Sequence, residues 1–449
     1  MRWLILPAFV LALAGGPVSA TPAIEVSPAE AIEGDEVVVR VTGLAPGQVI
    51  TLHAGRRWGR YPTGSEAFAG QARFTAGADG VVDTRRDAPL AGSSYGGADA
   101  SGLFWSMTRV PDSASAAQAS EDVTLNLESN GATVASRQVR LATAAPGVRV
   151  RDVREDGVVG VFAGHGPGSV RPAVILLGGS EGGLYTARSL APILASRGYA
   201  TLGLGYFQGD EPDLAALPPN LEEIPLEAIA AARRWLARQS GVDAERIAVI
   251  GMSKGAELAL IAAATYPWID AVAAFAPSHV VWEGIPQDPP VRPATSSWTL
   301  AGKPLPFVRW SVAAERRGTA ARKANGRSRL TEPHLESLAL YAADVPAATI
   351  PLEASRAAVM LVAGIDDGMW PSAYSVEQIQ ARLTSAGYDR PVEVEISPTG
   401  HQVLGTGWAP TTAFQRPTGR LQGGDAKLDA QAQAAGWRKL LTFLERHLR

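Results

Sequence analysis

Short apolar runs alternate with amphipathic stretches in the second part of the sequence, and this alternation limits the possible folds more than any other feature. The runs lie at residues 173–177, 200–204, 247–250, 272–275, 358–363 and 392–396. Helical stretches lie between them, including 225–238, 254–264 and 375–386. Fully apolar strands joined by amphipathic crossovers favour a largely parallel sheet with helices on both faces. A last helix over about 425–447 carries Trp437 and Phe443 and is expected to pack against this sheet.

The segment from residue 21 to about 145 has a different pattern, which is that of β-structure. Runs with strand character lie at residues 23–26, 36–41, 49–53, 124–127 and 133–141. Turn sequences such as Ala45-Pro46-Gly47 separate them, and short strands at this spacing favour a β-sandwich. Ala144-Ala145-Pro146-Gly147 has the composition of a linker. We therefore predict a β-sandwich domain over 21–145 and an α/β domain over 146–449.

The first twenty residues have the features of a secretory signal peptide. Arg2 provides a positive start, an apolar run follows from Trp3 to Ala14, and Val18-Ser19-Ala20 offers small residues for cleavage. The apolar run is too short for a stable membrane span. The alternative interpretation is an uncleaved N-terminal anchor. We expect residues 1–20 to be removed, and the mature protein to be periplasmic or secreted with no stable membrane span.

The composition excludes several kinds of partner and site. Hydrophobic residues make up 46% of the chain and charged residues 19%, which is typical of a folded globular protein. The sequence contains no cysteine, which excludes disulfides, zinc–thiolate sites and a lipid-attachment cysteine. The net charge is −3, or about −4 without Arg2, and provides no electrostatic reason to expect nucleic-acid binding. We expect neither a metal nor a cofactor.

A G-x-S-x-G sequence lies between an apolar run and a helical stretch. Residues 247–250 lead directly into Gly251-Met252-Ser253-Lys254-Gly255, and a helical stretch follows. A tight strand-to-helix turn holds such a serine in a strained, exposed position, and the glycines leave room for close backbone approach. The helix N-terminus adds N–H groups and positive potential where an oxyanion develops. Ser253 is therefore the candidate nucleophile of a serine hydrolase.

A serine hydroxyl needs a base, and the order of the elements selects one of the six histidines. His401 follows the last apolar run and precedes the final helix, which is the place of the base when the triad runs Ser, Asp, His along the chain. His279 is a candidate pocket residue, and His334 lies in a lid-like segment. His401 is therefore the predicted base.

The acid is expected on the loop that follows the apolar run at 358–363. Asp366 and Asp367 are both there, and neighbouring side chains that leave a strand point in different directions. The spacing from Gly364 favours Asp367 as the acid. Asp366 is then a loop or capping residue.

Two backbone N–H groups are needed to stabilise an oxyanion. One is expected from Lys254, directly after the nucleophile, and the other from the loop Gly178-Gly179-Ser180-Glu181-Gly182-Gly183 after the first hydrolase strand. Within this loop Ser180 is the first choice and Glu181 the second. We interpret Glu257, in the first turn of the helix, as a complement to the helix dipole rather than as a catalytic acid.

The strand–helix alternation breaks between residue 278 and about residue 351. This segment is rich in proline, tryptophan and arginine, and it is expected to form a lid-like insertion. Its basic residues include Arg316, Arg317, Arg322 and Lys323. They form either a solvated surface or a clamp for phosphates or another anionic part of a substrate.

With these motifs, the sequence resembles the acyl-CoA thioesterase / bile acid-CoA:amino acid N-acyltransferase family over nearly the whole mature chain. The motifs that carry the resemblance are Gly251-Met252-Ser253-Lys254-Gly255-Ala256-Glu257, Gly364-Ile365-Asp366-Asp367-Gly368-Met369-Trp370 and Thr399-Gly400-His401. Further similarity lies at 423–440 and, near the N-terminus, at 43–47 and 102–107.

The resemblance implies an immunoglobulin-like domain ahead of an α/β-hydrolase. It also implies Ser253 as nucleophile, Asp367 as acid and His401 as base. The family's amino-acid-conjugating acyltransferases use cysteine at the nucleophile position, so a serine there favours transfer to water. Characterised family members act inside cells on CoA thioesters, whereas this chain is expected to be exported.

These features together predict a hydrolase that cleaves small-molecule acyl thioesters or esters through an acyl-enzyme on Ser253. One alternative is an exported carboxylesterase or dienelactone-hydrolase-like enzyme that does not use CoA. The other is a catalytically silent protein that uses its sandwich domain for binding.

Overall fold

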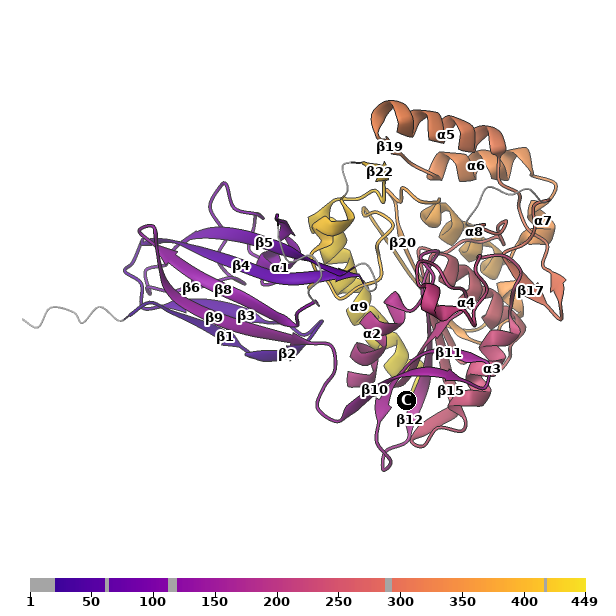
Figure 1. Cartoon of the computed structure of the whole chain (residues 1–449), viewed down its shortest axis with the longest axis horizontal. Helices are drawn as coiled ribbons and strands as arrows, with labels where there is room; N and C mark the ends of the chain where they lie inside the picture. The colour runs from indigo at the N-terminus through magenta and orange to yellow at the C-terminus, as the bar shows by residue number, and fades with distance from the viewer. Residues whose placement is uncertain (1–20, 61–63, 112–118, 287–292, 416–417) are drawn as a thin grey trace, which may run out of the picture.

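The computed structural model describes residues 21–60, 64–111, 119–286, 293–415 and 418–449. The expected signal peptide lies outside the described residues. Figure 1 shows two parts, a β domain at the left and a larger α/β domain at the right. The segment between β9 (Ala132–Ala142) and β10 (Val148–Glu155) joins the last long strand of the β domain to the first strand of the α/β domain.

Eight strands form the central sheet of the α/β domain. They are β10, β11 (Val158–His165), β12 (Arg171–Leu177), β13 (Ala200–Gly205), β15 (Val242–Met252), β16 (Ala271–Phe275), β20 (Ala358–Gly364) and β21 (Val392–Ser397). Their order across the sheet is β10-β11-β13-β12-β15-β16-β20-β21. β11 is antiparallel to both of its neighbours, and the other pairs are parallel. This is the topology of the α/β-hydrolase fold, and the prediction of a largely parallel sheet is confirmed.

Helices cover both faces of the sheet because the strands are apolar on both sides. On one face, α3 (Glu227–Leu236), α4 (Lys254–Thr265) and α8 (Ser372–Ser385) share a core with side chains such as Ile175 and Val249. On the other face, α2 (Tyr185–Ser196) and α9 (Ala426–Leu448) pack against alternate residues such as Val174 and Ala248. The last helix therefore contacts the sheet as the sequence predicts.

The β domain consists of two packed sheets. One contains β1 (Ala23–Ser27), β3 (Val38–Thr42) and β6 (Val82–Asp83); the other contains β2 (Glu30–Ile32), β9, β8 (Asp122–Ser129), β4 (Val49–Arg60), β5 (Gly64–Thr75) and β7 (Thr108–Arg109). Val39 from the first sheet and Leu52, Phe74 and Leu125 from the second lie in one buried core. The predicted β domain ahead of the hydrolase is confirmed, although β4 is longer than the predicted run and β5 was not assigned from the sequence.

The β domain is packed against the segment that follows His401. Trp408 lies in the core of the β domain, where its ring meets Phe104 of α1 (Gly102–Trp105) edge-on, with 5.1 Å between ring centroids. Arg197 at the end of α2 forms an ion pair of 2.5 Å with Asp35. The β domain therefore supports the same stretch of chain that carries the histidine.

The insertion is folded rather than an open loop. Its elements are β17 (Trp298–Leu300), β18 (Lys303–Pro304), α5 (Val312–Asn325), β19 (Arg327–Ser328), α6 (Thr331–Leu340) and α7 (Val345–Ala348). β17 pairs with β14 (Ile224–Pro225), and β19 pairs with β22 (Gly419–Arg420). Figure 1 shows α5 and α6 above the hydrolase, at the end where β20 points. Within the described ranges, no helix combines the length and the apolar character needed to cross a bilayer.

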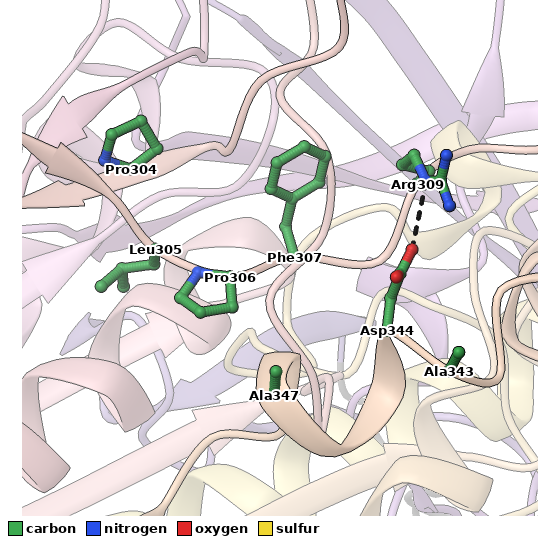
Figure 2. A pocket seen from close by; sticks show the side chains of 8 residues that line it. All are labelled: Pro304, Leu305, Pro306, Phe307, Arg309, Ala343, Asp344 and Ala347. Atoms are coloured by element: carbon green, nitrogen blue, oxygen red, sulfur yellow. Dashed lines mark hydrogen bonds and ion pairs between the residues drawn. The ribbon is translucent and has the colours of Figure 1, made fainter.

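The insertion also carries a cleft. The cleft has a volume of about 460 Å³ and is lined by residues from 304 to 309 and from 343 to 347. Figure 2 shows its polar wall, where Arg309 Nε donates to Asp344 Oδ2 at 3.1 Å. None of its lining residues is one of the predicted site residues.

Candidate active site

Ser253 lies on a strained turn between β15 and α4. Its backbone has φ 57° and ψ −122°, a conformation that L-residues rarely adopt. The flanking glycines are required by space: a Cβ on Gly251 would lie 2.1 Å from the carbonyl oxygen of Gly255, and one on Gly255 would lie 2.1 Å from that of Gly178. The Ser253 N–H donates to Phe275 O at 2.8 Å, which holds the turn against β16. This is the nucleophile elbow that the local sequence predicts.

Asp367 and His401 meet after β20 and β21. His401 Nδ1 lies 2.8 Å from Asp367 Oδ2 and 3.0 Å from Oδ1, and both side chains are buried. An ionised carboxylate can only accept, so Nδ1 carries the proton and Nε2 is left as the basic nitrogen. The Asp367 carboxylate is held by the N–H groups of Met369 and Trp370 and by the Ser372 hydroxyl, which donates at 2.7 Å. The imidazole is therefore held in one tautomer.

Asp366 has a different role from that of its neighbour. Its carboxylate forms an ion pair of 2.8 Å with Arg329 and accepts the N–H of Gly424 at 2.8 Å. These two contacts connect the acid loop, which follows β20 and carries Asp366 and Asp367, to the insertion and to the segment before α9. The structure therefore pairs His401 with Asp367, and Asp366 is a loop residue.

Trp370 connects the elbow region with the Asp367–His401 pair. Its indole N–H donates to Ala276 O at 3.0 Å, directly after the residue that accepts the Ser253 N–H, and its ring lies 6.2 Å from that of His401. In the described part of the chain, no hydrogen bond joins Ser253 Oγ to His401 Nε2, and neither atom is closed off from accessible space. Such bonds are often long before substrate binds.

The glycine-rich loop after β12 lies beside the nucleophile. A Cβ on Gly179 would lie 3.1 Å from Ser253 Cβ. The Gly179 N–H is already used, because it donates to Glu181 Oε1 at 3.1 Å, and the Tyr206 hydroxyl donates to the carbonyl of Gly178 at 2.6 Å. Ser180 is the exposed residue at the tip of this loop. Hydrogen bonds thus hold this loop next to Ser253, where the sequence predicts an oxyanion donor.

Glu257 lies in the first turn of α4, as the sequence predicts, and it also forms a buried polar network that the sequence does not reveal. Its carboxylate is fully buried and accepts the Lys254 ammonium at 2.8 and 2.9 Å, the Trp282 N–H at 3.1 Å and the Trp298 indole N–H at 2.7 Å. The Lys254 ammonium also lies 5.3 Å from the centre of the Trp298 ring. Burial raises the pKa of Glu257 and lowers that of Lys254, and their attraction opposes both shifts. This network joins the nucleophile helix to the insertion.

Two histidines outside the predicted triad are buried near it. His279 Nδ1 lies 3.0 Å from Ser375 Oγ, and burial lowers the pKa of His279 to about 4. His334, on α6, is surrounded by tryptophan rings, and burial lowers its pKa to about 3. Both are therefore neutral at ordinary pH. The sequence places both outside the triad, but it contains no signal for their burial.

Arg329 of the insertion donates to the carbonyl oxygens of Asp366 and Asp367 at 3.0 and 3.1 Å. Within the described residues, no contact brings the basic side chains of α5 to the predicted triad. Arg317 pairs with Glu336 on α6. Arg316, Arg322 and Lys323 lie on the outer helix α5 and form no ion pair within the described residues. The same described ranges contain no cluster of three or more acidic or histidine side chains suited to a metal ion.

The sheet topology and the elbow define a serine hydrolase with the α/β-hydrolase fold. Residues 224–449 match the family described as BAAT / acyl-CoA thioester hydrolase C terminal, and residues 34–155 match the acyl-CoA thioester hydrolase/BAAT N-terminal region. The chain belongs to this acyl-CoA thioesterase/BAAT family.

Two relatives align with this chain over most of their length. Acyl-coenzyme A thioesterase 6 of Mus musculus is 30% identical over 427 residues, which cover 91% of this chain and 93% of the relative. The mitochondrial acyl-coenzyme A thioesterase 2 of Homo sapiens is 27% identical over 432 residues, covering 92% and 82%. Among solved structures, a putative dienelactone hydrolase from Klebsiella pneumoniae aligns with a TM-score of 0.41 and 15% identity, over 67% of this chain and 98% of that one.

Proposed function

We propose that this protein hydrolyses acyl-CoA thioesters with Ser253, Asp367 and His401 as its catalytic triad. The observation that carries the proposal is the contact of both Asp367 oxygens with His401 Nδ1, at the sheet edge where the strained Ser253 turn lies. The names of the relatives support a CoA thioester as the substrate.

In the first half-reaction, His401 Nε2 accepts the proton of the Ser253 hydroxyl as Oγ attacks the acyl carbonyl. The N–H groups of Lys254 and Ser180 stabilise the oxyanion. The carbon–sulfur bond then breaks, and the leaving sulfur takes the proton from His401. In the second half-reaction, His401 removes a proton from water, which attacks the acyl-enzyme and releases the carboxylic acid and the free Ser253 hydroxyl.

Paired serine variants test the nucleophile. Ser253→Ala should abolish thiol release from an acyl-CoA and prevent labelling by a fluorophosphonate, because no other group can form the acyl-enzyme. Ser385→Ala, at an exposed position at the end of α8, is the matched control and should keep wild-type turnover. Retained turnover in folded Ser253→Ala would refute the assignment.

The two neighbouring aspartates test the acid. Asp367→Asn should lower kcat by a factor on the order of 10⁴, because the amide favours the wrong imidazole tautomer. Asp366→Asn should cause a far smaller loss, since its side chain contacts Arg329 and the Gly424 N–H rather than His401. A reversed ranking of the two variants would transfer the role of the acid to Asp366.

We also propose that Arg316, Arg317, Arg322 and Lys323 contact the phosphates of the CoA moiety. Arginine and lysine side chains bind phosphate by charge-assisted hydrogen bonds. Reversing all four charges should raise KM for an acyl-CoA by about tenfold or more. The KM for an acyl thioester of N-acetylcysteamine, which has no phosphate, should not change. Equal effects on both substrates would contradict the phosphate contact.

Export of the protein is a further proposal, and it is supported by the pattern of residues 1–20. Expression of the full chain in a bacterial host should yield a protein in the periplasm. Its intact mass should equal that of a chain that begins at Thr21. A protein that keeps Met1 and stays in the cytoplasm would contradict it.

A further inference from the structure

His334 is enclosed by aromatic rings next to the predicted triad. Its imidazole meets Trp282, Trp310 and Trp370 edge-on, with ring centroids 4.7, 4.5 and 6.0 Å away. Trp370 in turn lies against the ring of His401. The indole of Trp370 therefore contacts both His334 and the predicted base.

One tautomer of His334 is selected by its backbone partner. Nδ1 lies 2.7 Å from Leu330 O, and a carbonyl oxygen can only accept, so Nδ1 carries the proton. Burial lowers the pKa of His334 to about 3, so the ring stays neutral. Its Nε2 is then a hydrogen-bond acceptor. Within the described residues Nε2 has no partner, and it is not sealed from accessible space.

The position of His334 is coupled to the acid loop. The N–H of Leu330 donates to Gly368 O at 2.8 Å, and the Thr331 hydroxyl donates to Asp367 O. The Asp367 carboxylate raises the pKa of His334 and the Lys254 ammonium lowers it, so both groups lie within electrostatic reach of the ring. The insertion thus holds an unpaired acceptor at a constant place beside the reacting groups.

We propose that His334 Nε2 is a specificity-determining acceptor that selects thioesters bearing an amide N–H a few bonds from the scissile sulfur. A hydrocarbon group placed against this nitrogen would leave a buried acceptor unpaired, whereas an N–H donor satisfies it. Saturated acyl chains contain no such donor, so the donor belongs to the thiol half of the substrate. This inference rests on the proposed thioesterase activity of the same site.

Two thioesters with one acyl group test the proposal. One is the S-acyl thioester of N-acetylcysteamine; the other has an ester oxygen in place of its amide N–H. Thiol release is followed for both, so cleavage of the second compound's oxygen ester does not register. The wild-type protein should prefer the N–H compound in kcat/KM by about 5- to 30-fold, the value of one hydrogen bond.

Substitutions of His334 separate its two nitrogens. His334→Gln keeps an acceptor near the position of Nε2 and should retain the preference. His334→Asn keeps only the group that replaces Nδ1, and His334→Phe keeps only the ring shape; both should reduce the preference to about one, because the acceptor is lost. If His334→Asn does not fold, His334→Phe tests the loss of the acceptor in its place.

The outcomes distinguish this inference from the proposed function. If the wild-type protein cleaves neither compound nor an acyl-CoA, the proposed function fails. If it cleaves both compounds at equal rates, or if all variants keep the wild-type ratio, hydrolysis stands and the role of His334 is wrong.

Discussion

The buried Lys254–Glu257 pair offers a sharp test of the forces that hold the nucleophile helix to the insertion. In Glu257→Gln, the amide oxygen can still accept from the Trp282 N–H and the Trp298 indole, since both donate to the same carboxylate oxygen, Oε1. The Lys254 ammonium, whose side chain is 4% exposed, loses its counter-charge. Breaking a buried pair from one side typically costs about 3–5 kcal/mol.

A second substitution should recover part of this loss. In Lys254→Met/Glu257→Gln, both charges are absent and the two N–H groups keep their acceptor, so the remaining cost is that of an unpaired amide, about 1–3 kcal/mol. The double variant should therefore be more stable than Glu257→Gln alone. Urea unfolding at pH 7, followed by tryptophan fluorescence, measures the free energy of unfolding of each variant, and Lys254→Met as the other single variant completes a double-mutant cycle.

An exposed ion pair provides the matched control. Arg238 and Asp156 lie 2.5 Å apart with more than half of each side chain exposed. Asp156→Asn should change the free energy of unfolding by less than about 1 kcal/mol, because water screens the pair. If Glu257→Gln has an equally small effect, or if the double variant is no more stable than the single one, the coupling inferred for Lys254 and Glu257 is wrong.

Three further predictions concern stability. Burial raises the pKa of Asp429 to about 6 from an ordinary 3.8, so its stabilising contribution is complete below about pH 4 and is lost as pH rises through 6. Asp429→Asn should remove this pH dependence and raise the free energy of unfolding at pH 7.5 by up to about 3 kcal/mol. Urea unfolding at about pH 4 and at about pH 7.5 measures both effects. Trp408→Ala should lower the free energy of unfolding by about 3–5 kcal/mol, because it leaves a cavity beside Phe104. An unchanged thermal midpoint in calorimetry would contradict a stabilising contact between the two domains. Gly255→Ala should yield little soluble protein, since its Cβ would overlap the backbone of Gly178; normal yield and thermal midpoint would argue against the tight elbow.

Chain order was sufficient to select His401 and the loop that carries the acid, and the spacing from Gly364 favoured Asp367 over Asp366. In a parallel sheet, the carboxyl ends of neighbouring strands lie at one edge, so residues after the runs at 247–250, 358–363 and 392–396 are brought together whatever fills the space between them. The elbow is also local, because strand, turn glycines and helix follow one another directly. The contact of Asp367 with His401 agrees with that reasoning.

Two strands of the central sheet, β10 and β11, were not predicted from the sequence. β10 is an edge strand whose residues are mostly exposed and charged, so it contains no apolar run. β11 pairs with it in an antiparallel hairpin that precedes the strand–helix alternation. A pattern that relies on burial therefore overlooks the exposed edge strand β10. This reason does not apply to β11, whose residues are mostly buried and which lies between β10 and β13.

By itself, the sequence determined the α/β class, the strained serine and the order of its partners, because these depend on neighbours along the chain or on strand order. Only the tertiary structure decided which polar groups are buried. Glu257 accepts from Trp282 and Trp298, which lie 25 and 41 residues further along. His334 is enclosed by rings from three separate segments. Burial is set by which distant segments pack together, and no local pattern encodes that choice.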